Sequence, residues 1–194
     1  MSDRGIRQDF RTMKNALLGT VAVLALALPA FASAPDSGLK VGEMVSAFHP
    51  THVGGPDKGT DTCPPCKYGN RPAVQVWHNH DDEENLVATI KHLDAKVGSS
   101  KHELKAFAIR VAFCDGCAGE TSKLSEKVGN VKVGIAHVNA SDEAIEAYKY
   151  NIDREVKNTV FVYKNKKVVE KFVNFKADKA GLAKLDAAIA KIDN

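Results

Sequence analysis

The residues with the most evident chemistry are four cysteines in two CxxC pairs, Cys63–Cys66 and Cys114–Cys117. Thiols at this spacing can exchange disulfides, bind a metal ion, or form a local structural cross-link. Covalent c-type haem is excluded, because Lys67 and Ala118 stand where that motif requires a histidine.

The first pair is Cys63-Pro64-Pro65-Cys66, followed by Lys67. The lysine charge would favour a thiolate at Cys66, and the two prolines stiffen the bridge. A disulfide that closes so short a loop removes little chain entropy, so its stabilisation is small. We interpret this pair as a cross-link that fixes a loop, with redox exchange and metal binding as open alternatives.

The second pair follows an apolar, β-rich run over 106–113. In parallel α/β sheets, chemistry collects at the carboxyl ends of the strands. Cys117 also falls near the start of a predicted helix, whose dipole lowers a thiol pKa. This pair is the better placed for chemistry, with Cys114 as the attacking thiol and Cys117 as its mate.

Two histidines, His78 and His80, end the preceding β-rich run. If the two runs are adjacent strands, both histidines share one rim with Cys114 and Cys117. Sulfur and imidazole together suit Cu(I) or Zn²⁺, and a histidine there could also act as a base beside a thiolate. A surface disulfide beside two solvated histidines is the alternative.

Another potential metal set lies near the first pair. His49 and His52, with Cys63 and Cys66, supply two imidazoles and two sulfurs within 18 residues. Zinc accepts such a tetrahedral S₂N₂ set. Two solvated loop histidines are the alternative here.

Hydrophobic periodicity predicts the elements that position these residues. Asp81 and Ser141 are expected to cap helices, as is Asp178. The resulting order is strand 72–77, helix 81–98, strand 106–113, helix 120–128, strand 131–138, a helix after 141, an antiparallel hairpin over 159–173 and a helix after 178. Such alternation predicts a mixed sheet with right-handed crossovers. The two cysteine pairs then lie at opposite ends of the sheet, which predicts local disulfides.

This order resembles the thioredoxin superfamily, and most closely its exported peroxiredoxin-like and TlpA/ResA-like branch. Val41–Phe48 is similar to the opening segment of those proteins, and the hairpin over 159–173 to their strand pair. The resemblance covers 41–192. It implies an α/β thioredoxin-like mixed sheet flanked by helices, and thiol-disulfide exchange as the activity.

Two departures from that family concern the active site. Its redox CxxC follows the first central strand, where this chain has Trp77–Asp82 without cysteine. Its cis-proline precedes the hairpin, where this chain has Val156–Thr159 without proline. The standard active site is therefore absent, and any exchange must use another pair.

The first 32 residues have the pattern of a secretory signal peptide. Basic residues precede the apolar run Ala16–Leu28, and small residues follow at Ala30 and Ala32. Cleavage after Ala32 would leave a periplasmic or secreted protein without a stable membrane anchor; a retained anchor is the alternative. A loop-rich segment over 33–71, which holds the first pair, and an α/β core over 72–194 would follow.

Charge excludes some partners. The net charge is +3, and residues 33–194 carry 23 basic and 22 acidic side chains. This balance lacks the excess of basic residues that is typical of nucleic-acid-binding proteins.

We expect an exported thiol-disulfide exchange protein whose partner is a disulfide-bearing exported protein. A zinc or copper module that meets a metal donor or acceptor, and a disulfide-stapled binding domain, are the alternatives.

Overall fold

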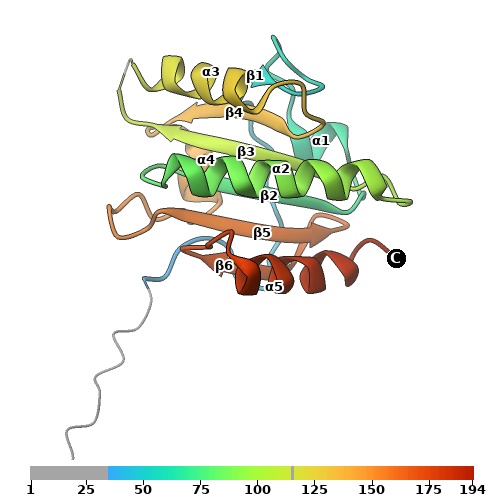
Figure 1. The fold of residues 1–194 in the computed structure, drawn as a ribbon. Coiled ribbons are helices and arrows are strands. Elements are labelled where there is room, and N and C mark those ends of the chain that lie inside the picture. The colour runs from blue at the N-terminus through green and yellow to red at the C-terminus, as the bar shows by residue number, and fades with distance from the viewer. Residues whose placement is uncertain (1–34, 115) are drawn as a thin grey trace, which may run out of the picture. The chain divides into compact units, whose positions relative to one another are not determined.

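The structure is a computed structural model that describes residues 35–114 and 116–194. The predicted signal peptide lies outside these residues. Figure 1 labels the elements, which are β1 (Thr51–Gly54), α1 (Pro64–Lys67), β2 (Ala73–His78), α2 (Glu83–Ser99), β3 (Lys105–Ala112), α3 (Cys117–Val128), β4 (Gly134–Asn139), α4 (Glu143–Ala147), β5 (Asn158–Lys164), β6 (Lys167–Val173) and α5 (Lys179–Ala190).

The strands form one six-stranded mixed sheet in the order β1-β4-β3-β2-β5-β6. β2, β3 and β4 run parallel, while β5, β6 and β1 pair antiparallel with their neighbours. This arrangement confirms the predicted α/β mixed sheet. It also confirms that β2 and β3, which end beside the histidines and the second cysteine pair, are adjacent.

Each face of the sheet is covered by its own apolar cluster. Alternate residues of β2, including Val74 and Val76, pack with apolar residues of α2, α3 and α5. On the opposite face, Trp77 packs against Tyr148 with ring centroids 4.5 Å apart, and α4 belongs to this cluster. The period-two alternation of the strands thus fills both layers.

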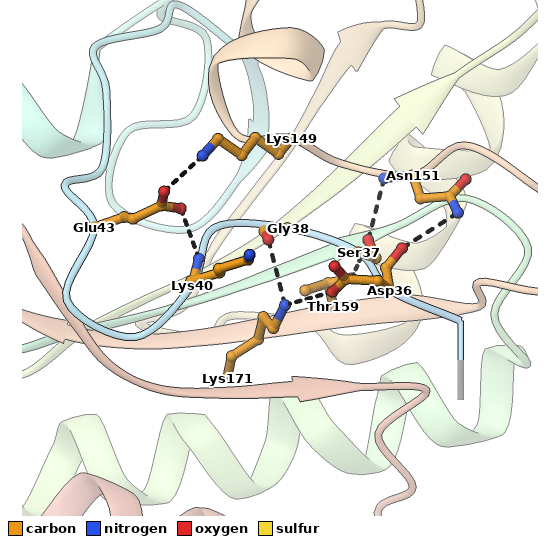
Figure 2. Close-up of polar contacts among 9 residues, drawn as sticks. All are labelled: Asp36, Ser37, Gly38, Lys40, Glu43, Lys149, Asn151, Thr159 and Lys171. Carbon is orange, nitrogen blue, oxygen red and sulfur yellow. Dashed lines mark hydrogen bonds and ion pairs between the residues drawn. The ribbon is translucent and has the colours of Figure 1, made fainter. Parts of the chain in front are cut away.

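The N-terminal segment, residues 36–43, lies on the sheet face that carries Trp77 and Tyr148. Polar contacts hold it there (Figure 2). Buried Ser37 accepts hydrogen bonds from the Thr159 hydroxyl, at 2.8 Å, and from the Asn151 backbone N–H. Asp36 pairs with Lys171 at 3.0 Å. These contacts fix the segment to β5, β6 and the loop after α4.

Two predicted helix caps are wrong by one residue. α2 is capped by Asp82, which accepts the Glu84 N–H, and not by Asp81. α4 is capped by Asp142, and not by Ser141. In both places neighbouring side chains can accept the same backbone donors, so local sequence alone does not select between them. Asp178 caps α5 as predicted.

Other element ends shift by a few residues. α2 runs past Gly98 to Ser99. α3 begins at Cys117 where the prediction began at 120, and β4 begins at Gly134 where the prediction began at 131.

The hairpin turn at Asn165 and Lys166 has positive φ at both residues, as two-residue hairpin turns of type I′ require. No helix of the described part of the chain is both long and apolar enough to cross a bilayer.

Candidate functional site

Both cysteine pairs form local disulfides, as the sequence predicts. The Cα atoms are 5.2 Å apart in Cys63–Cys66 and 5.3 Å apart in Cys114–Cys117. Among the described residues no cysteine is free.

The two disulfides lie at opposite ends of the sheet. α1 leads into the amino end of β2, where Ala73 pairs with Lys105 at the start of β3. Cys114 instead follows the carboxyl end of β3. Figure 1 shows α1 and the start of α3 at these opposite ends. The second pair therefore occupies the edge where chemistry collects in parallel sheets.

The first disulfide has one buried and one exposed partner. Cys63 is 4% exposed and caps α1, and its Sγ accepts the Cys66 N–H at 3.2 Å. Pro64 and Pro65 are buried beside it, whereas Cys66 is exposed. Cys63 is thus the buried cysteine of this pair, and Cys66 is the one that faces solvent.

A buried carboxylate fixes the loop around this disulfide. The side chain of Asp57 is 1% exposed and accepts hydrogen bonds from the Lys67 ammonium and, at 2.8 Å, from the Tyr68 hydroxyl. Burial alone would raise the pKa of Asp57, but these two donors outweigh it and lower the pKa below its usual value. This network immobilises the chain directly after Cys66.

The two nearby histidines contact the same loop. A ring nitrogen of His49 lies 3.0 Å from the Asp61 carbonyl, and one of His52 lies 2.9 Å from the Thr62 carbonyl. Within residues 35–114 and 116–194, no three His, Cys, Asp or Glu side chains are grouped so that they could hold a metal ion. Metal binding by a reduced form of either predicted set stays a prediction.

The second disulfide is more accessible. Cys114 is exposed, and Cys117 is partly exposed at the first position of α3. The Cys117 N–H donates to the Cys114 carbonyl at 3.0 Å, and the buried Thr121 hydroxyl donates to the Cys117 carbonyl at 2.9 Å. The first bond spans the CxxC loop, and the second lies within α3.

The histidines of this rim have different environments. His80 is exposed and stacks on Phe113, the residue before Cys114, with ring centroids 5.7 Å apart. His78 is 1% exposed, and burial together with the Arg110 charge lowers its pKa to about 3. Only His80 therefore lies at the surface beside the disulfide loop.

Sequence reasoning missed an ion pair that spans this loop. Arg110 of β3 pairs with Glu120 in the first turn of α3, with 2.5 Å between Nη2 and Oε2. Arg110 is the one charged residue within the apolar run 106–113. A lone charge inside a predicted buried strand was the available signal, because such charges are usually paired.

The place of the redox motif in the family that the sequence resembles is taken by a partly buried carboxyl group, that of Asp81. Asp81 accepts hydrogen bonds from the side chains of Asn85 and Asn158. Burial raises its pKa, although these donors oppose the shift. A cavity of about 700 Å³ adjoins it, lined also by His80 and Lys157. Asp81 has no sulfur chemistry, so this position cannot replace a redox cysteine.

Comparison with solved structures places this geometry in a known fold. The chain resembles a protein assigned as the thiol:disulfide interchange protein DsbE from Chlorobium tepidum, with 13% identity over 80% of this chain and 99% of that one, at a TM-score of 0.58. It also resembles the yeast mitochondrial 1-Cys peroxiredoxin, with 17% identity over 77% of this chain and 76% of that one, at a TM-score of 0.54. A cysteine-to-serine mutant of PrxQ from Xylella fastidiosa is similar with 15% identity over 78% of this chain and 98% of that one, at a TM-score of 0.53.

These likenesses show that the fold is thioredoxin-like, of the kind found in thiol-disulfide oxidoreductases and peroxiredoxins. No protein-family model matches the sequence, and no curated protein matches it. A shared fold does not transfer an activity, so the function must be argued from the two disulfides themselves.

Proposed function

We propose that the protein is an exported thiol-disulfide exchange protein in which Cys114–Cys117 is the reactive pair and Cys63–Cys66 is a fixed cross-link. The observation that carries this assignment is the contrast in accessibility and position between the pairs. Cys114 is exposed and Cys117 partly exposed at the carboxyl end of β3. In the first pair Cys66 is exposed, but Cys63 is buried and the loop is tied to Asp57.

In the exchange step, a partner thiolate attacks Sγ of the exposed residue Cys114. The Cys114–Cys117 bond breaks, and its electron pair stays on Cys117 as a thiolate. A second partner thiol, once deprotonated, attacks the mixed disulfide and releases Cys114. The partner dithiol becomes a disulfide, and this chain gains two electrons and two protons. The reverse sequence oxidises the chain and reduces a partner disulfide.

The start of α3 favours this direction of bond breaking. Cys117 occupies the first position of a 12-residue helix, whose dipole stabilises a negative sulfur at that end. A leaving thiol of lower pKa departs faster. Attack at Cys114 therefore produces the better leaving group.

Export is part of the proposal, because it decides the resting state of the cysteines. The predicted signal peptide over 1–32 would deliver the protein to the periplasm or outside the cell, where disulfides persist. The expected partner is then an exported protein with its own thiols or disulfide.

The test is a catalytic assay of disulfide exchange on a protein substrate, run with two double variants. Cys114→Ser with Cys117→Ser should abolish the activity. Cys63→Ser with Cys66→Ser should keep most of it, because that pair lies at the other end of the sheet. The opposite result would move the activity to Cys63–Cys66, and no activity in wild type would refute exchange. Zinc or copper retained by the reduced protein in elemental analysis would favour the metal-binding alternative.

A further inference from the structure

Arg110 carries a permanent charge into the sheet beside the reactive loop. Its side chain is 19% exposed, and its only ion-pair partner among the described residues is Glu120. Arg110 lies four residues before Cys114, and Glu120 three residues after Cys117. The pair thus joins the chain on the two sides of the disulfide.

The guanidinium group is only partly satisfied. Arg110 Nε is buried and has no hydrogen-bond partner within residues 35–114 and 116–194. Arg110 pairs in register with His78 on β2 and with His137 on β4. Burial lowers the pKa of both histidines, so neither brings charge to this row near neutral pH. Glu120 thus contacts Nη2, while the buried Nε donor of the same charged group makes no hydrogen bond among the described residues, and such a donor calls for a physical explanation.

The ion pair and the disulfide share helix α3. Glu120 follows Cys117 by three residues on α3, so their Cβ atoms lie about 5–6 Å apart, and Glu120 holds the Arg110 guanidinium. A cavity of about 290 Å³ adjoins Arg110 and is lined also by Asp81, Glu83, Glu120 and Lys123. Arg110 therefore has space to change its contacts.

We propose that Arg110 is the counter-ion of the thiolate formed at Cys117 when the disulfide opens, and that Glu120 holds Arg110 in place while the disulfide is intact. This role rests on the proposed function. On attack at Cys114, the electron pair of the broken S–S bond moves to Cys117 Sγ, and the unused donors of Arg110 stabilise that charge. Glu120 competes for the same guanidinium, which makes the two residues act in opposite directions.

The test uses the Cys63→Ser, Cys66→Ser background, so that only the second disulfide is read. Two quantities are measured: the rate constant for reduction by dithiothreitol, and the position of equilibrium with reduced and oxidised glutathione. Arg110→Met should slow reduction about tenfold and shift the equilibrium toward the disulfide, as expected for loss of a nearby opposite charge. Glu120→Gln should speed reduction and favour the dithiol, and Arg110→Lys should restore much of the wild-type rate.

Glu126→Gln is the matched control, because it removes a carboxylate from an exposed position of the same helix. It should leave both quantities unchanged. Shifts of the same sign for Arg110→Met and Glu120→Gln, or wild-type values for both in folded protein, would overturn the role of Arg110. These readouts need no protein substrate, so they remain informative if the proposed exchange activity fails.

Discussion

His78 and Arg110 are register partners across the β2–β3 ladder, and each has a buried side-chain nitrogen without a hydrogen-bond partner in the part of the chain that the structure describes. The arginine is charged at every physiological pH, and its charge is one cause of the lowered pKa of His78. Arg110 is thus the cation of this pair, and its charge together with burial disfavours a second positive charge on His78.

The first prediction concerns the stability of the protein in acid. His78 has a pKa of about 3 in the folded protein and about 6.5 when unfolded. The unfolded chain therefore binds an extra proton between these values, so stability is lost as the pH falls from 6.5 toward 3. His78→Leu should leave the unfolding free energy at pH 7 nearly unchanged and reduce its loss between pH 7 and pH 4 by about 3 kcal/mol.

Urea unfolding at several pH values measures this effect. His102→Leu, at an exposed histidine, is the control for the same side-chain change. A His78→Leu variant that loses as much stability in acid as wild type would show that His78 is not kept neutral.

The second prediction concerns the N-terminal segment. Gly38 has φ +82°, and a Cβ there would collide with the ring of Phe161. Gly38→Ala should destabilise the protein by about 3 kcal/mol or more, from backbone strain and overpacking together. Gly59 has the same φ with open space around it, so Gly59→Ala should cost only about 1–2 kcal/mol. Equal losses in thermal unfolding would show that Gly38 is not packed against Phe161.

The third prediction tests the polar attachment of the same segment (Figure 2). Ser37→Ala leaves the Thr159 hydroxyl and the Asn151 N–H without their acceptor, at a cost of about 1–3 kcal/mol. Lys40 is exposed, and its contact with Glu43 uses the backbone N–H. Lys40→Ala should therefore change stability by less than about 0.5 kcal/mol. Similar chemical-denaturation midpoints for the two variants would contradict the attachment.

Most of the architecture could be predicted from the spacing of apolar residues along the chain, which distinguishes strands from helices. The apolar run 106–113 and the run ending at Trp77 are β-rich, and helical spacing separates them. Right-handed crossovers then require the parallel pairing that β2 and β3 show. The placement of the cysteine pairs at opposite ends of the sheet follows from the same rule.

The remaining features depend on contacts between residues distant in sequence. Asp81 is displaced from its predicted capping role by Asn158, which lies 77 residues away. His78 and His80 look equivalent in sequence, yet one is buried and the other exposed, because β2 ends at His78. The lone charge of Arg110 can be noticed in the sequence, but its partner Glu120 is identified only once α3 packs beside β3.

The fourth prediction concerns processing. Signal cleavage after Ala32 should give a mature protein that begins at Ser33, three residues before Asp36 and its contact with Lys171. Intact mass and N-terminal sequencing of protein recovered from the periplasm or medium test this. Ala32→Leu should block cleavage, because the site requires a small residue there. Full-length wild-type protein in the membrane fraction would instead indicate a retained anchor.

The most direct test of the central claim is a competition between the two disulfides for limiting reductant. The mature wild-type protein receives one equivalent of a dithiol reductant, is alkylated at successive times, and is mapped by mass spectrometry. We predict that Cys114 and Cys117 are labelled about tenfold or more faster than Cys63 and Cys66, because Cys114 is exposed and attack on it releases Cys117, the better leaving thiolate. Faster labelling of Cys63 and Cys66, or equal labelling of both pairs, would contradict the assignment of Cys114–Cys117 as the reactive pair.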